Sequence, residues 1–266
     1  MTKVQVNGVG LNTVIDGDDG HNKPWIVLSN SLGSNLSMWD DQIEALSQTY
    51  RVLRYDTRGH GGSDVPAGDY QLAHLVADVI GLMDAHNIEK AAFMGLSMGG
   101  MTGMGLALLH PDRFSGIVVC DARADAPEGF KQSWDDRSAF IREKGMAALV
   151  TPTLERWLSP SFHDSNPERT RWLGDMVTNT APDGYIGCAM ALKQLDYLKD
   201  LPKVTIPMLY VGGEIDAGAM PDVMQAMADA TPGASYIQIE GAAHIANVDK
   251  PAAFNEAITP FLALER

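Results

Sequence analysis

Residues 91–101 read AAFMGLSMGGM, and this stretch decides the fold expected for the chain. It begins as a short apolar run of the kind that forms buried strands. The run ends at a serine enclosed by Gly95 and Gly99, and apolar residues then recur at the three- and four-residue spacing of an amphipathic helix. A serine on a tight turn between a strand and a helix presents its hydroxyl to an incoming reactant. Ser97 is therefore the candidate nucleophile.

Further apolar runs repeat the pattern of a buried strand along the chain. They lie at residues 25–30, 51–56, 116–121, 207–213 and 235–240, with helical periodicity at 72–87. Strands that alternate with helices predict a parallel sheet covered on both faces. The stretch KVQVNGVGLNTVI (3–15) predicts an antiparallel hairpin at the sheet edge, with Asn-Gly at its turn. We expect an α/β fold with a mostly parallel central sheet flanked by helices.

The alternation stops between residues 123 and 200, where helical periodicity continues without strand-like runs. This segment holds three of the five tryptophans, and the parallel pattern resumes after it. A helical insertion between two strands of one sheet usually lies over the carboxyl ends of the strands. We expect an α/β core at residues 1–122 and 201–266, with a helical cap at 123–200 inserted before the last strands.

Composition limits the classes of partner and the compartment. The formal net charge of −14 disfavours binding to nucleic acid or anionic membranes. No apolar stretch reaches the roughly 20 residues of a membrane span, and the first residues lack the apolar core of a signal peptide. The two cysteines, Cys120 and Cys188, are far apart in the sequence, and neither lies near a histidine at metal-ligand spacing. We expect free thiols in the cytoplasm, no metal and no organic cofactor.

A serine nucleophile requires a base and a group that orients the base. His244 follows the last strand-like run in a loop of small residues, and Asp216 follows the run before it. This order, nucleophile then acid then histidine, is the order of the strand-to-helix serine motif. Glu214 is the rival acid, but Asp216 lies further beyond the strand end. His60 competes as the base, but it precedes Ser97, and its glycine-rich stretch fits a loop that shapes the edge of the site.

An oxyanion formed during attack requires backbone N–H donors, each contributing about 2.7–4 kcal/mol in measured cases. The Met98 amide is one, because it follows the nucleophile and begins a helix. Leu32 is the second, because Gly33 allows the loop after residues 25–30 to fold its amides inward. We place Trp39 and Trp134 in the substrate pocket, although Trp39 fits a core position equally well.

The chain resembles the α/β-hydrolase fold family, within the 3-oxoadipate enol-lactonase-like group that also contains carboxylesterases. The stretches that carry the resemblance are WIVLSNSLGSNLSMW (25–39), RVLRYDTRGHGGSD (51–64), GLSMGGMTG (95–103), PMLYVGGEID (207–216) and GAAHIANVDKP (241–251). Transferred to these positions, the family triad is Ser97, Asp216 and His244. The resemblance places the two oxyanion amides at Leu32 and Met98.

These residues predict a serine hydrolase that cleaves small-molecule carboxylic esters or lactones through an acyl-enzyme. The alternatives within the resemblance are a 3-oxoadipate enol-lactonase and an acyl-homoserine-lactone hydrolase. An enol-lactone substrate carries a carboxylate, so a cation should face the pocket; the candidates are Arg123, Lys131, Arg137 and Lys193. A ligand receptor without catalysis is a separate class, which the complete set of triad and amide donors disfavours.

Overall fold

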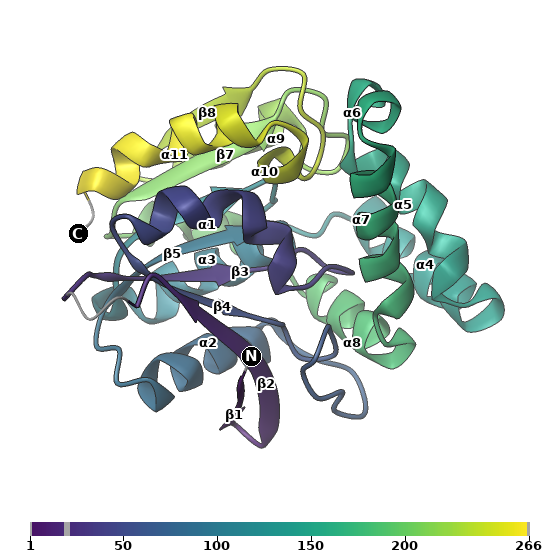
Figure 1. Cartoon of the computed structure of the whole chain (residues 1–266), viewed down its shortest axis with the longest axis horizontal. Coiled ribbons are helices and arrows are strands. Elements are labelled where there is room, and N and C mark those ends of the chain that lie inside the picture. Colours follow the sequence, from purple (N-terminus) through teal and green to yellow (C-terminus); the bar gives the residue numbers. More distant parts are fainter. Residues whose placement is uncertain (1, 19–21, 265–266) are drawn as a thin grey trace.

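The computed structural model describes residues 2–18 and 22–264, and within them eight strands form one sheet in the order β1-β2-β4-β3-β5-β6-β7-β8 (Figure 1). The strands are β1 (Thr2–Val6), β2 (Val9–Asp16), β3 (Trp25–Ser29), β4 (Arg51–Tyr55), β5 (Ala91–Leu96), β6 (Phe114–Cys120), β7 (Met208–Gly213) and β8 (Ser235–Ile239). β1 and β2 pair antiparallel, as do β2 and β4, and the remaining pairs are parallel. The predicted α/β fold with a mostly parallel sheet is confirmed.

The amino-terminal hairpin forms where the Asn-Gly pair predicts it. Asn7 and Gly8 have φ of 50° and 76°, so the chain reverses through two residues in the left-handed region. This turn matches the right-handed twist of paired strands, and Asn and Gly are the residues that adopt it at least cost. Val6 pairs with Val9 across the turn, which leaves β1 at the edge of the sheet.

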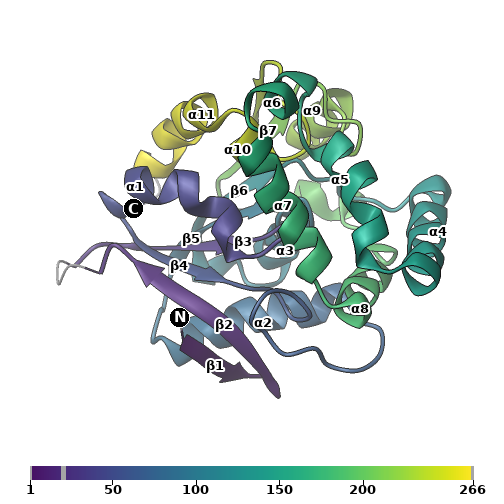
Figure 2. The same cartoon turned by 45° about the vertical axis from the view of Figure 1, so that its right-hand side comes forward.

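Helices cover both faces of the sheet. They are α1 (Asp40–Ser47), α2 (Leu72–Ala85), α3 (Met98–Leu109), α9 (Pro221–Ala230), α10 (Ala246–Asp249) and α11 (Pro251–Leu264). α1 and α11 pack together on one face, and α2 and α3 pack together on the other (Figures 1 and 2). β5 and β6 at the centre of the sheet are almost completely buried, which explains their continuous apolar sequence.

The chain between β6 and β7 is helical. It contains α4 (Glu128–Lys144), α5 (Val150–Trp157), α6 (Pro160–Ser165), α7 (Pro167–Asn179) and α8 (Pro182–Leu192). Figures 1 and 2 draw these helices as one group beside the sheet. The two ends of the segment meet, because the Tyr197 and Leu198 amides donate to the Ala124 carbonyl at 2.7 and 3.0 Å. We call this segment, residues 123–200, the helical insertion.

Parallel strands β3 to β8 end at one common edge of the sheet. Functional groups in α/β proteins gather at this edge, because the loops after neighbouring strands lie side by side there. The loops after β3, β5, β7 and β8 carry Leu32, Ser97, Asp216 and His244 respectively. No helix among the described residues is long and apolar enough to cross a bilayer.

Candidate active site

Ser97 lies at the junction of β5 and α3 in a conformation that the sequence enforces. Its φ of 55° and ψ of −111° are rare for a residue with a side chain and cost on the order of 1–3 kcal/mol. The flanking glycines make the turn possible: a Cβ on Gly95 would lie 2.2 Å from the Gly99 carbonyl oxygen. A Cβ on Gly99 would lie 2.2 Å from the Ser29 carbonyl oxygen. Only glycine fits at either position.

The three residues predicted as a triad form one chain of hydrogen bonds. His244 Nε2 lies 3.0 Å from Ser97 Oγ, and its Nδ1 lies 2.8 Å from Asp216 Oδ2. Asp216 and His244 are buried, and Ser97 is 9% exposed. Burial acts to raise the pKa of Asp216, but the His244 imidazole and the Gly218 amide at 2.7 Å outweigh it and hold that pKa below its usual value. An ionised Asp216 accepts a hydrogen bond from Nδ1–H, which leaves Nε2 unprotonated and able to take the serine proton.

The rivals for acid and base have other partners. Glu214 is exposed, and its carboxylate accepts the Gly241 amide at 2.8 Å, so it braces the loop that carries His244 instead of contacting the imidazole. His60 is buried, and its Nε2 accepts the Gly33 amide at 3.0 Å. Desolvation by burial lowers the pKa of His60, which keeps the imidazole neutral and able to accept. His60 thus supports the loop after β3 through its hydrogen bond from Gly33.

The two predicted oxyanion amides are available for a ligand. Within the part of the chain that the structure describes, neither the Leu32 nor the Met98 amide donates a hydrogen bond. The neighbouring Gly99 amide, by contrast, donates to the Asn30 carbonyl at 3.1 Å, which joins the loop after β3 to the first turn of α3. The loop and the helix that carry the two free amides are therefore fastened to each other next to Ser97.

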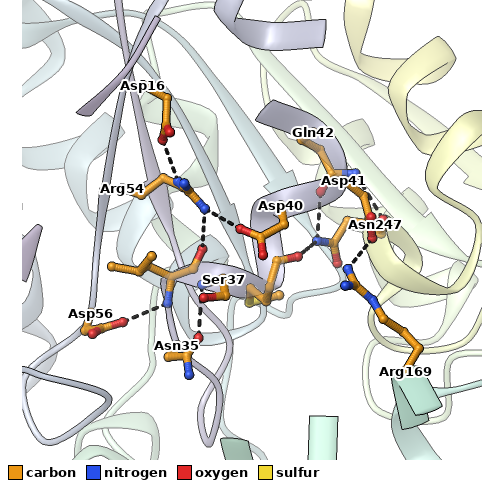
Figure 3. Close-up of polar contacts among 12 residues, drawn as sticks. Asp16, Asn35, Ser37, Asp40, Asp41, Gln42, Arg54, Asp56, Arg169 and Asn247 are labelled. Atoms are coloured by element: carbon orange, nitrogen blue, oxygen red, sulfur yellow. Dashed lines mark hydrogen bonds and ion pairs between the residues drawn. The ribbon is translucent and has the colours of Figure 1, made fainter. Parts of the chain in front are cut away.

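A polar network holds the segment after Leu32 from the side of the sheet (Figure 3). The Leu36 amide donates to Asp56 at 2.7 Å, and the Leu36 carbonyl accepts from the Arg54 guanidinium at 3.3 Å. Arg54 is in turn held by Asp16 at 2.8 Å and Asp40 at 2.6 Å. Because the backbone N–H and C=O of Leu36 are both hydrogen-bonded, the turn η1 (Leu36–Trp39) has a fixed position relative to the sheet.

The same segment is bound from the opposite side by the loop that carries His244. Asn247, which is fully buried in α10, donates its side-chain amide to the Met38 carbonyl at 2.8 Å and to Gln42 Oε1 at 3.1 Å. Further out in Figure 3, Arg169 of α7 pairs with Asp41 of α1 at 2.6 Å. The segment after Leu32 and the helix α10 that follows His244 therefore form one hydrogen-bonded unit.

A cavity of about 250 Å³ opens beside Ser97 and His244. Core loops supply one wall, and α4 and α5 of the helical insertion supply the other. The side chains from the insertion include Phe130, Trp134, Arg137 and Arg156. Phe130 and Trp134 meet edge to face at 5.5 Å between ring centroids.

Two arginines in the cavity wall lack a carboxylate partner among the described residues. Arg137 stacks over Trp134 at 4.7 Å from the ring centroid and donates to the Tyr185 hydroxyl at 3.3 Å. Arg156 Nε is buried without an acceptor. Desolvation and the charge of nearby Arg137 lower the pKa of Arg156 to about 10. Two close cations, of which Arg156 is desolvated, are unfavourable alone, so the cavity is suited to an anion.

The remaining pocket predictions have mixed outcomes. Trp134 lines the cavity, but Trp39 does not: it is fully buried against Phe254, with ring centroids 6.4 Å apart. The prediction of Trp39 as a pocket residue is therefore wrong, because its turn η1 directs the indole into the core.

The cations predicted to face the pocket also have different outcomes. Arg123 lines the cavity, but Asp125 already neutralises it at 2.8 Å. Lys131 pairs with Glu128 at 3.7 Å, and Lys193 pairs with Asp135. Arg156 was missed by sequence reasoning. No local sequence signal marks it, because the face that α5 turns toward the cavity depends on what that helix packs against.

Asp121 is a buried acid at the end of β6, in the cavity wall. It accepts the Gly213 amide at 2.8 Å and the Ala246 amide at 3.4 Å. Burial, with the negative charge of Asp216, raises the pKa of Asp121 well above its usual range. This side chain ties β7 to the histidine loop. No group of three or more His, Cys, Asp or Glu side chains within the described ranges is arranged to hold a metal ion.

Comparisons with known proteins agree with this architecture. Residues 24–251 match a family model described as the alpha/beta hydrolase fold. 3-Oxoadipate enol-lactonase 2 of Acinetobacter baylyi is 37% identical over 236 residues, which cover 89% of this chain and 87% of that protein. The enol-lactonase of Burkholderia xenovorans LB400 has a TM-score of 0.94 at 40% identity, with 98% of this chain and 99% of that chain covered. A thermophilic, malate-bound esterase from Thermogutta terrifontis has a TM-score of 0.90 at 27% identity, covering 99% and 97%.

Proposed function

The chain belongs to the α/β-hydrolase fold family, and on that premise we propose that it is a serine hydrolase that cleaves carboxylic esters or lactones. The observation that carries the proposal is the continuous hydrogen-bond chain from Ser97 through His244 to Asp216, with distances of 3.0 and 2.8 Å. The free amides of Leu32 and Met98 beside it support a role in binding the oxyanion. The enol-lactonase relatives support attack on a lactone or ester carbonyl.

In the proposed reaction, His244 Nε2 takes the proton of Ser97 as Oγ attacks the carbonyl carbon. The tetrahedral oxyanion accepts hydrogen bonds from the Leu32 and Met98 amides. His244 then gives its proton to the departing alcohol oxygen, which for a lactone is the ring oxygen, as the carbon–oxygen bond breaks. A water molecule, deprotonated by His244, hydrolyses the resulting acyl-enzyme and regenerates Ser97.

The test of the reaction type is Ser97→Ala assayed on p-nitrophenyl acetate and on simple lactones. We expect loss of turnover by about 10⁴-fold or more, because the remaining donors cannot replace a nucleophile. A phosphonate probe should label wild type at Ser97 and leave the variant unlabelled. Near-native turnover by Ser97→Ala would exclude the proposed nucleophile. Labelling of wild type without product release would instead favour the non-catalytic receptor.

A more specific function is supported by Arg137 and Arg156, the cavity-wall cations without a carboxylate partner. Both arginines line the same cavity as Ser97, which favours a substrate that carries an ionised carboxylate in addition to the ester or lactone carbonyl. 3-Oxoadipate enol-lactone has that chemistry, and enol-lactonases are among the relatives. We therefore favour the enol-lactonase alternative over a neutral-ester or acyl-homoserine-lactone hydrolase. Turnover of 3-oxoadipate enol-lactone, compared with p-nitrophenyl esters and homoserine lactones, tests this; a clear preference for the neutral substrates would reject it.

We also propose that residues 123–200 act as a cap that selects the substrate, over a core of residues 1–122 and 201–266. Residue 1, residues 19–21 and residues 265–266 of this division lie outside the described residues. The support is the closure of the insertion at Ala124 and Tyr197, and its supply of one wall of the cavity. Exchange of this segment for that of a neutral-ester hydrolase should change substrate preference while retaining Ser97 labelling.

A further inference from the structure

His244 lies between two backbone amides that connect it to the helical insertion, one directly and the other through Asp249 of α10. The Ile245 amide, on one side of it, donates to the Trp157 carbonyl at 3.1 Å. The Ala243 amide, on the other side, donates to Asp249 Oδ2 at 2.8 Å. Trp157 is the last residue of α5, so the proposed base is bound to the segment where α5 leads into α6.

Asp249 extends the same connection through its side chain. It is 4% exposed, and it accepts the Ser159 amide at 3.0 Å and the Ser159 hydroxyl at 2.7 Å. Within residues 2–18 and 22–264, no Lys, Arg or His forms an ion pair with this carboxylate. A buried carboxylate without a cation is costly unless several donors satisfy it. Its donors come from two sources, Ala243 beside the base and Ser159 in the insertion.

We propose that Asp249 is a positioning residue that fixes the His244 loop to the helical insertion through Ser159. It touches neither Ser97 nor the cavity, so its action passes through the backbone of the histidine loop. The inference rests on the proposed role of His244 as the base. It adds that the insertion has two tasks: it forms the cavity wall, and it sets the distance between the imidazole and Ser97. Misplacement of a reacting group by about 1 Å lowers the rate by roughly 10²-fold, so a small shift of this loop is measurable.

Ser159→Ala is the mildest test, because it removes the hydroxyl contact and keeps the amide contact to Asp249. We expect kcat for p-nitrophenyl acetate to fall about tenfold with KM changed less than about twofold, because a misplaced base weakens the transition state without altering the cavity. Ser159→Thr retains the hydroxyl and should restore kcat. The matched control is Thr180→Val, which removes another buried hydroxyl bond of the insertion, from Thr180 Oγ1 to the Met176 carbonyl at 2.9 Å, away from the histidine loop.

Asp249 itself is tested by an isosteric and a truncated variant. In Asp249→Asn the side-chain oxygen still accepts the Ala243 and Ser159 amides, so we expect a loss within about tenfold. Asp249→Ala removes all three contacts, and a loss of about 10²-fold in kcat is expected. If Asp249→Ala fails to fold, the Ser159 series decides the question alone.

Hydrogen exchange of a peptide covering residues 240–250 provides a readout that does not require catalysis. Faster exchange of this peptide in Ser159→Ala, with Thr180→Val unchanged, would support the connection even if Ser97→Ala proved active and the proposed reaction failed. Equal kcat values for Ser159→Ala and Thr180→Val, with unchanged exchange at 240–250, would overturn the inference. So would failure of Ser159→Thr to restore kcat.

Discussion

The two sides of the cavity differ in how their functional groups are held. On the core side, Ser97, Asp216 and His244 are each bound to another member of the set, and their loops follow strands of one sheet. On the insertion side, Arg137 and Arg156 come from helices and have no carboxylate partner among the described residues. The functional groups of the core side therefore satisfy one another without a ligand. The two arginines of the insertion side have no carboxylate to pair with among the described residues. On the proposed function, the first side sets the reaction type and the second the choice of substrate.

The largest expected effect tests whether the hydrogen-bonded chain of Ser97, His244 and Asp216 on the core side works as proposed. Asp216→Asn should lower kcat by up to about 10⁴-fold, because an amide in place of the carboxylate stabilises the wrong tautomer of His244. Glu214→Gln is the matched control, since that exposed carboxylate accepts the Gly241 amide and makes no hydrogen bond to His244. Steady-state kinetics on p-nitrophenyl acetate measure both. A larger loss in Glu214→Gln than in Asp216→Asn would mean that the observed relay is not the working one.

The next effect tests whether Arg156, on the insertion side, binds the carboxylate of an anionic substrate. Arg156→Met should lower kcat/KM for a carboxylate-bearing lactone by about 10- to 100-fold, the worth of a charge-assisted hydrogen bond, and leave neutral esters within a few-fold. Arg123→Met should have a smaller effect on the same substrate, because Asp125 already neutralises that cation at 2.8 Å. Equal losses on anionic and neutral substrates would show that Arg156 supports the wall and does not select the anion.

The same contrast explains how much the sequence could predict. The hydrogen-bonded chain of Ser97, His244 and Asp216 was readable because each member follows a strand of one sheet. Gly95 and Gly99 encode the Ser97 turn through local sterics. Trp39 was misplaced and Arg156 missed for a shared reason. The direction of a side chain on a helix or turn depends on what that element packs against, and such long-range packing has no local sequence signal. The strand pattern fixed the edge of the sheet where the site lies, but not the residues that face it from the insertion.

A smaller effect concerns His60, which accepts a hydrogen bond from the Gly33 amide in the loop after β3. Burial lowers the pKa of His60 in the folded state, so between that value and about 6.5 the unfolded chain binds a proton that the folded chain does not. The contribution to stability is therefore fully present above pH 6.5 and is lost as the pH falls toward the folded-state pKa. Urea unfolding of wild type at pH 7 and pH 5 should show this loss. His60→Gln cannot titrate, and a loss in that variant as large as in wild type would assign the pH dependence to other groups.

The smallest effect concerns backbone requirements on the two sides. Gly129, at the start of α4, is exposed and a Cβ there meets nothing within 4 Å, so Gly129→Ala should raise the free energy of unfolding by about 0.5–1 kcal/mol through helix propensity. A Cβ on Gly100, in the first turn of α3 after Ser97, would lie 2.8 Å from the Ala122 Cβ, so Gly100→Ala should destabilise the fold. Denaturant unfolding of both variants measures the difference. Opposite signs are expected because the core packs α3 against β6 through glycine, whereas the exposed start of α4 has no such close contact; destabilisation by Gly129→Ala would contradict that account.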